Sequence, residues 1–217
     1  MNRPRIAALV LTAALVTGAC GSDPDRQLAG LDLIDPVSDP DRQLVGYRRE
    51  PAPVVGGLSL PDLTNPGADL SLQAGPEHLL VIYFGYTNCP DFCPTTLSDL
   101  RLATRRMDED LAARVDVAMV TIDPERDLAV LPDYVTSFFA DGHALGTDDD
   151  NLLAQAAGPF GVAYNIEQTP DGVTEVSHTT ALYAVDDSGQ LALTWPFGVA
   201  IDDLAADLTQ LLESSSE

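Results

Sequence analysis

The sequence contains no lysine, and all 11 of its basic residues are arginines, against 34 aspartates and glutamates. The formal net charge is therefore −23. A protein that binds nucleic acid, or that docks on anionic lipid by charge, needs a basic surface to meet phosphate. The charge excludes both classes of binding and leaves a cation or a basic partner as compatible ligands. Most of the acidic surplus is interpreted as a solubility feature.

Cysteine is scarce as well, with 3 residues in a chain of 217. So few cysteines exclude a small fold that is held together by several disulfides. A hydrophobic content of 45% is enough for a sizeable buried core, and this excludes global disorder. The length corresponds to one domain, alone or with extensions.

Residues 1–19 have the pattern of a signal for export from the cytoplasm. Two arginines form a basic start, an apolar run follows at residues 6–16, and small residues precede Cys20. The run is too short for a membrane-spanning helix, which requires about 20 apolar residues. The place of Cys20 resembles a bacterial lipobox, although Thr17 stands where leucine is usual. We therefore expect a lipoprotein signal peptide and a lipid anchor on Cys20, at the extracytoplasmic face of the cell membrane. The alternative is an ordinary cleaved signal.

Residues 20–52 are predicted to be a flexible acidic tether, because they are rich in aspartate, proline, glycine and glutamine. A short repeat lies within this segment. Residues 23–30 (DPDRQLAG) recur at residues 39–46 (DPDRQLVG), with one difference in eight positions. Two copies are too few for a solenoid. The repeat is interpreted as a duplication in a segment that tolerates change.

Residues 53–213 are predicted to form one domain of alternating strands and helices. Apolar runs and turn signals predict strands at residues 79–84, 115–122, 161–164, 179–185 and 191–195, the last two as a hairpin. Amphipathic spacing predicts helices at residues 94–111, 128–139, 151–160 and 201–212. This order predicts an α/β fold, a thioredoxin-like three-layer sandwich with a central mixed sheet.

The candidate chemical site is a pair of cysteines where the first buried strand meets the first helix. Residues 83–94 read YFGYTNCPDFCP and contain Cys89 and Cys93. A helix N-terminus carries unpaired N–H groups and partial positive charge, so a cysteine there is expected to have a lowered pKa. Residues four apart lie on one face of a helical turn. The pair is therefore compatible with a Cys89–Cys93 disulfide when oxidised, or with one soft ion such as Cu(I) or zinc.

A third ligand for such an ion has to come from elsewhere in the chain, which contains 3 histidines. His178 precedes the predicted hairpin, whose first strand begins beside the cysteine turn in a thioredoxin-like sheet. This makes His178 the best candidate. His78 lies at the far end of the first buried strand and His143 in a predicted loop. Both are interpreted as surface or packing residues.

Three motifs together resemble the Sco/SenC family. They are the cysteine segment, Asp-Pro-Glu-Arg-Asp at residues 123–127, and His178 before a strand that ends in aspartate. The resemblance covers residues 55–212. It implies a thioredoxin-like fold on a membrane anchor, with one copper ion bound by Cys89, Cys93 and His178. It also implies that Asp123 lies near these ligands, although Asp123 is equally well explained as a helix or turn cap.

The resemblance implies a copper metallochaperone that helps to assemble the copper-A centre of cytochrome c oxidase. Two thiolates and one imidazole suit Cu(I), and an additional weak ligand would permit Cu(II). The expected partner is the copper-A subunit, and the protein is expected to be a monomer. The alternative is a thiol–disulfide oxidoreductase that keeps the cysteines of the oxidase reduced, so enzymatic activity is left open.

Four features of the sequence bear on the alternatives. Three residues separate the cysteines, unlike the two of thioredoxin, and Thr180 stands where thioredoxins have a cis-proline. Both features disfavour the oxidoreductase. A peroxidase of the peroxiredoxin type is discounted, since the proline of its Pro-x-x-x-Thr/Ser-x-x-Cys motif is missing. Zinc storage is disfavoured because no fourth ligand is evident.

Overall fold

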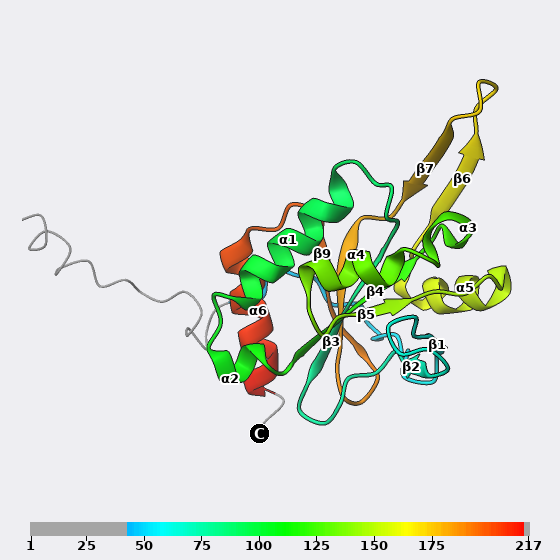
Figure 1. Cartoon of the computed structure of the whole chain (residues 1–217). Helices are drawn as coiled ribbons and strands as arrows, with labels where there is room; N and C mark the ends of the chain where they lie inside the picture. The colour runs from blue at the N-terminus through cyan, green and yellow to red at the C-terminus, as the bar shows by residue number, and fades with distance from the viewer. Residues whose placement is uncertain (1–42, 215–217) are drawn as a thin grey trace, which may run out of the picture. The chain divides into compact units, whose positions relative to one another are not determined.

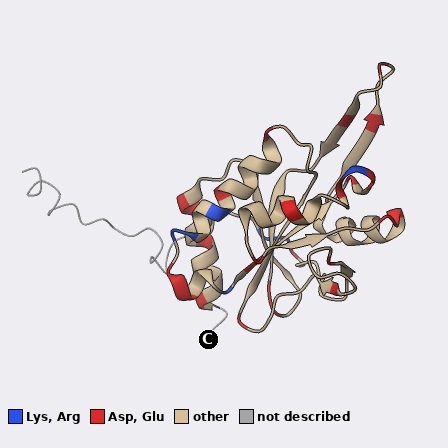
Figure 2. Cartoon of the chain, in the orientation of Figure 1, with Lys and Arg blue, Asp and Glu red and all other residues tan. Residues whose placement is uncertain are grey.

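The computed structural model describes residues 43–214 (Figure 1). The predicted signal peptide, Cys20 and most of the predicted tether lie outside these residues. Within residues 43–214, no helix combines the length and the apolar character that a membrane span requires. Figure 2 shows acidic residues spread over helices, strands and loops rather than gathered on one element, as a general solubility role for the charge requires.

A five-stranded mixed sheet lies at the centre of the fold, in the order β5-β4-β3-β8-β9. Three strands run parallel to one another: β3 (Leu79–Gly85), β4 (Val115–Thr121) and β5 (His143–Leu145). Two strands complete the sheet in antiparallel fashion: β8 (Ala181–Val185) and β9 (Leu191–Pro196). Every residue of β3 is buried, because this strand is central and both faces of the sheet are covered. The predicted central mixed sheet is confirmed.

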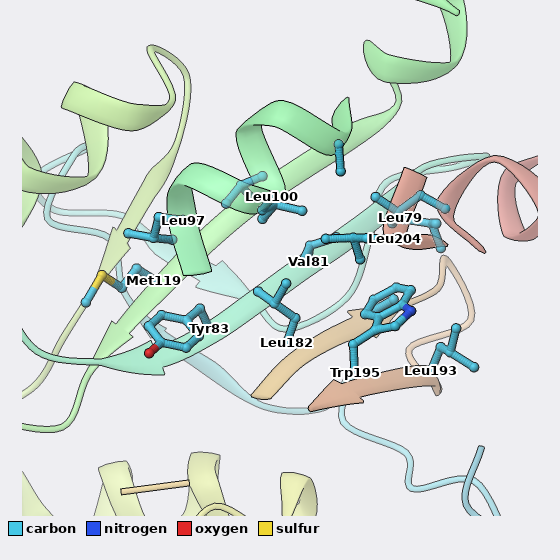
Figure 3. Close-up of a cluster of buried hydrophobic side chains, with 14 of the residues drawn as sticks. Leu79, Val81, Tyr83, Leu97, Leu100, Met119, Leu182, Leu193, Trp195 and Leu204 are labelled. Carbon is cyan, nitrogen blue, oxygen red and sulfur yellow. The ribbon is translucent and has the colours of Figure 1, made fainter. Parts of the chain in front are cut away.

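Helices cover both faces of the sheet. One face packs against α1 (Phe92–Thr104), α4 (Leu131–Phe138) and α6 (Ile201–Ser214). The other face packs against α5 (Asp150–Ala157) and a small antiparallel pair, β1 (Ser59–Pro61) and β2 (Asp69–Ser71). Side chains alternate along β3, so Leu79, Val81 and Tyr83 point toward α1 and α6 (Figure 3). These layers confirm the predicted three-layer α/β sandwich.

Three of the four predicted helices are shorter in the structure than in the sequence-based prediction, whereas the last one extends to Ser214. The segment 94–111 forms α1 and a separate short helix, α2 (Glu109–Ala112), because Asp108 adopts an extended conformation between them. In place of one helix at residues 128–139, the structure has two short helices. The first, α3 (Pro124–Asp127), ends before this segment, and the second is α4. Pro132 lies in the first turn of α4, where its missing N–H costs little but would interrupt a helix that continued from α3. The segment 151–160 is α5 followed by a 3₁₀ turn, Gly158–Phe160.

A two-stranded antiparallel ribbon precedes the predicted hairpin. It consists of β6 (Tyr164–Gln168) and β7 (Thr174–His178), and it projects beyond the sandwich (Figure 1). The sequence predicted only a short strand at residues 161–164, which was wrong, because most side chains of the ribbon are exposed and give no apolar pattern. His178 is the last residue of β7, and His143 opens β5 rather than lying in a loop.

The described part of the predicted tether, residues 43–52, contacts the domain. Tyr47 forms an antiparallel bridge with Thr194 at the edge of β9, with N–H···O distances of 3.0 Å in both directions. Leu44 packs against the buried cluster on the α1 and α6 side of the sheet. The domain therefore extends to residues before the predicted boundary at residue 53.

Candidate metal centre

The two cysteines lie where the chain leaves β3 and enters α1. Cys93 occupies the first turn of α1 and is fully buried, and Cys89 lies in the preceding turn with little exposure. Both are free thiols, and the backbone N–H of Cys93 donates to Cys89 Sγ at 3.3 Å. The first N–H groups of a helix have no partner within the helix, so the sulfur of Cys89 satisfies one of them.

Burial, rather than the helix N-terminus, dominates the ionisation of Cys93. Removal from water, together with the neighbouring Cys89, raises the pKa of the Cys93 thiol to about 12. The prediction of a lowered pKa at the helix start is therefore wrong for this residue. A cation held between the donors would reverse the balance, because coordination to a metal ion favours the thiolate.

Gly85 makes room for the sulfur of Cys93 at the end of β3. A Cβ atom at this position would lie 3.1 Å from Cys93 Sγ and 2.6 Å from Cε1 of Tyr83. Both distances are shorter than normal van der Waals contacts. The close packing of the site therefore explains why glycine occupies position 85.

His178 reaches the cysteines from the base of the ribbon. Its Nε2 lies 3.8 Å from Cys93 Sγ, and its Nδ1 lies 2.9 Å from the carbonyl oxygen of Thr179. A carbonyl oxygen only accepts, so Nδ1 carries the proton and the lone pair of Nε2 faces the sulfurs. Burial lowers the pKa of His178 and favours this neutral form.

Two tyrosines position the imidazole from its sides. The rings of Tyr83 and Tyr86 contact His178 edge to face, with centroids 6.2 Å and 5.7 Å away. Such edge-to-face pairs are favourable contacts between aromatic rings. Both tyrosines flank Gly85, so the segment that carries the cysteines also orients the histidine.

The structure brings the three predicted ligands together. The donor atoms of Cys89, Cys93 and His178 all lie within 4.8 Å of one another. Three atoms this close always leave a point within about 2.8 Å of all of them, and metal bonds to cysteine and histidine measure about 2.0–2.3 Å. A small closing movement completes a three-coordinate site. Among residues 43–214, this is the only group of three histidine, cysteine or acidic side chains close enough to hold an ion.

The other two histidines lie outside this group. Nδ1 of His78 is 3.0 Å from a carboxylate oxygen of Asp116, and Nδ1 of His143 is 2.8 Å from one of Asp62. Each imidazole therefore has a local acidic partner, in keeping with the surface or packing roles that the sequence suggested.

Asp123 lies directly after β4, at the N-cap position of α3. Its side chain does not cap the helix but pairs with Arg126, and its N–H donates to Thr121 Oγ1 at 3.0 Å. Within residues 43–214, none of these hydrogen bonds joins Asp123 to the three donors. Its predicted role beside the ligands stays a prediction.

Asp127 is the residue that the sequence analysis missed. Its carboxylate is fully buried and accepts from the N–H and the hydroxyl of Thr87, two residues before Cys89. The same carboxylate accepts from Thr121 Oγ1 at 2.7 Å, at the end of β4. Asp127 therefore fixes the cysteine turn to the neighbouring strand. The available signal was the second aspartate of the motif at residues 123–127.

The comparison with known families decides where this chain belongs. The sequence profile of SCO1/SenC matches residues 67–213. The chain belongs to the SCO1/SenC family. A relative in Stutzerimonas stutzeri, named as a putative copper-binding protein, is 27% identical over 72% of this chain and 76% of its own length. The human mitochondrial relative named Protein SCO2 homolog is 33% identical over 51% of this chain and 42% of its own length. The match thus spans less than half of that Sco protein.

Solved structures of Sco proteins share the fold. The apo Sco1 protein of Thermus thermophilus superimposes with a TM-score of 0.67 and 31% identity, over 79% of this chain and 98% of its own. The copper-bound ScoI of Bradyrhizobium japonicum superimposes with a TM-score of 0.59 and 29% identity, over 70% and 94% of the two chains. The thioredoxin-like fold predicted from the sequence is confirmed.

Proposed function

We propose that this protein binds one copper ion through Cys89 Sγ, Cys93 Sγ and His178 Nε2, and delivers it to the copper-A centre of cytochrome c oxidase. The observation that carries the proposal is the convergence of these three donors within 4.8 Å. Two sulfurs and one imidazole form a soft donor set, which favours Cu(I) over hard ions such as Mg²⁺ or Ca²⁺. The copper-bound solved relative supports copper as the metal.

Copper is the cargo of this site, so the ion has to leave as well as bind. Three donors leave at least one direction from which a thiolate of a recipient can approach the ion. The recipient must then contact the surface around the cysteines. Phe92, between the two cysteines, is 49% exposed and stacks edge to face on Phe197, which is 40% exposed, with centroids 4.8 Å apart. This aromatic pair offers the recipient an apolar contact beside the ion.

The site also supports a second candidate function, a thiol–disulfide oxidoreductase. Two free thiols on successive turns are the arrangement that forms one disulfide while a partner disulfide is reduced. Burial of both sulfurs weighs against this function, since the attacking thiol has to reach a disulfide of the partner. The position of His178 also favours copper, because disulfide exchange assigns no role to this imidazole.

The cellular setting is proposed from the sequence pattern of the N-terminus. We place the mature protein outside the cytoplasm, as a monomer anchored by lipid on Cys20 after removal of residues 1–19. Metabolic labelling with a fatty-acid analogue tests the anchor. Label on the parent protein and its loss in Cys20→Ser support it, whereas unlabelled parent protein contradicts it.

Anaerobic copper binding tests the proposed function directly. We expect one copper per reduced monomer by metal analysis, and no tight binding in Cys89→Ala or Cys93→Ala. In competition with a Cu(I) chelator, His178→Ala should bind at least about tenfold more weakly, equal to about 1.4 kcal/mol. His78→Ala is the matched control, because His78 pairs with Asp116 outside the site. Equal affinity in His178→Ala and the parent would refute the ligand assignment.

A transfer assay separates the two candidate functions. The recipient is the isolated copper-A domain of the oxidase, presented either with reduced cysteines and no copper or with its cysteines as a disulfide. The proposal predicts that His178→Ala, which keeps both thiols, transfers copper poorly to the reduced domain. Full support of copper-A assembly by this variant would favour the oxidoreductase.

A further inference from the structure

The N-terminal part of the described chain docks on a buried acidic residue of α6. Asp207 is fully buried, and its Oδ2 accepts from the N–H of Val45 at 3.0 Å and of Gly46 at 2.8 Å. The same oxygen accepts from the indole N–H of Trp195 at 2.8 Å. Hydrogen bonds to a buried carboxylate are strong, so Asp207 holds a specific stretch of backbone.

The docked stretch is constrained by packing at two positions and exposed at the third. A Cβ on Gly46 would lie 2.6 Å from Leu193 Cδ2 and 2.8 Å from Trp195 Nε1, and both side chains are fully buried, so this position favours glycine. Figure 3 shows Leu193 and Trp195 side by side on β9. Leu44 packs against the buried cluster, whereas the side chain of Val45 is 52% exposed. The site thus fits an apolar residue, then an exposed residue of any kind, then glycine.

The repeat found in the sequence supplies this pattern twice. The docked residues 44–46 end the second copy, and residues 28–30 (Leu-Ala-Gly) end the first. The single difference between the copies, alanine at residue 29 against Val45, falls at the exposed position. We propose that the Asp207 site has two occupants, and that residues 28–30 of the same chain dock there when residues 44–46 leave.

Exchange of the two copies changes the length of chain between Cys20 and the domain. With the second copy docked, residues 21–43 separate them, which is 23 residues; with the first copy docked, residues 21–27 do, which is 7 residues. At 3.3–3.6 Å per extended residue, the maximum reach falls from about 80 Å to about 25 Å. In a lipid-anchored protein, the exchange sets how far the cysteine site stands from the membrane. This consequence rests on the proposed anchor, but the docking itself does not.

The second copy is expected to be the major occupant. Its docking continues directly into the bridge between Tyr47 and Thr194, which the first copy would give up. Docking of the first copy also closes a longer loop before residue 53, at an entropic cost that grows only slowly with length. The first copy is therefore a minor occupant whose share rises when the second copy is blocked.

A blocked second copy provides the test. Gly46→Val introduces a clash with Leu193 and Trp195, and a photoreactive benzoylphenylalanine at position 29 reports where the first copy lies. In the Gly46→Val chain we expect a cross-link within one chain from position 29 to β9 or α6, found by mass spectrometry. The matched Gly30→Val/Gly46→Val chain should lose it. Absence of the cross-link in Gly46→Val, or cross-links only between chains, would overturn the proposal.

Fluorescence gives a second readout, because Trp195 is the only tryptophan of the chain and lies beside Gly46. Gly30→Val should emit like the parent. The emission maximum of Gly46→Val should stay close to that of the parent, because the first copy covers Trp195. In the double variant the maximum should shift to longer wavelength, because water reaches the indole. The same red shift in Gly46→Val and in the double variant would show that the first copy does not replace the second.

Discussion

The two cysteines and the histidine of the site are held by very different parts of the molecule. Cys89 and Cys93 sit between the central strand β3 and helix α1, and both are buried in the core. His178 ends a ribbon that projects from the sandwich and whose side chains are mostly exposed (Figure 1). Segments with few buried contacts open locally at low cost. The fold therefore fixes the sulfurs firmly, and the imidazole less firmly.

The contacts that hold the cysteine turn differ in kind from those that hold the imidazole. The cysteine turn is fixed by the buried carboxylate of Asp127 and by the close packing at Gly85. The imidazole is held by a hydrogen bond to the carbonyl of Thr179 and by the edges of two tyrosine rings. A bound ion would therefore tie the base of the ribbon to the core, and ligand substitutions on the two sides should differ in cost.

The largest effect is expected from loss of a sulfur on the rigid side. Cys93→Ser should lower the affinity for Cu(I) at least about 1,000-fold, or about 4 kcal/mol, because a hydroxyl is a hard donor. His178→Ala should cost less, about 10–100-fold, because the two sulfurs remain in position. Competition with a Cu(I) chelator measures both. An equal loss of Cu(I) affinity in the two variants would contradict the proposed difference between the rigid cysteine turn and the less firmly held histidine.

The next largest effect is expected from the carboxylate that fixes the cysteine turn. Asp127→Asn replaces charge-assisted hydrogen bonds in a buried position and should lower the free energy of unfolding by about 2 kcal/mol. It should also weaken copper binding about tenfold, as loss of groups that orient ligands does. Urea unfolding and chelator competition measure the two effects.

Asp123→Asn is the matched control for Asp127→Asn. Asp123 is buried as well, but its carboxylate pairs with the partly exposed Arg126, so the loss of unfolding free energy should be smaller, about 1 kcal/mol. Equal weakening of copper binding in both variants would contradict the claim that Asp127 in particular fixes the cysteine turn.

A smaller effect is expected from crowding of Cys93. Gly85→Ala places a methyl group 3.1 Å from Cys93 Sγ and should cost about 1–3 kcal/mol of stability through overpacking. Gly57→Ala is the control, because a Cβ there meets no atom within 4 Å. Thermal unfolding of the two variants gives the comparison. Equal stabilities would contradict the tight packing assigned to the sulfur.

The smallest effect is expected at the far end of the ribbon. Val173 is 54% exposed at the turn between β6 and β7, away from His178 at the base. Val173→Ser should leave stability within about 0.5 kcal/mol of the parent and copper affinity unchanged. Urea unfolding and copper titration check both values. A large loss of affinity would mean that the whole ribbon, and not only its base, positions the imidazole.

The regions that could be predicted from the sequence are those whose pattern is set by burial. The runs at β3 and β4 are apolar throughout because both faces of the sheet are covered, and this located the cysteine turn between β3 and α1. His178 could be nominated because it precedes a strand beside that turn. The three candidate ligands followed from spacing and position, together with the family resemblance.

The remaining features depend on contacts between distant residues. The ribbon has no apolar alternation, so its strands were missed. The bond between Asp127 and Thr87 joins residues 40 positions apart, and the docking of Gly46 on Asp207 joins residues 161 positions apart. Neither pairing leaves a periodic pattern in the sequence. The raised pKa of Cys93 was missed for a related reason, since the depth of its burial depends on how α1 packs.

X-ray absorption spectroscopy of the reduced, Cu(I)-loaded protein tests the central claim most directly. We predict two sulfur neighbours and one nitrogen neighbour per copper in the parent, and loss of the nitrogen neighbour in His178→Ala with both sulfurs kept. A copper environment of sulfur alone in the parent, or a nitrogen neighbour that persists in His178→Ala, would contradict a site built from Cys89, Cys93 and His178.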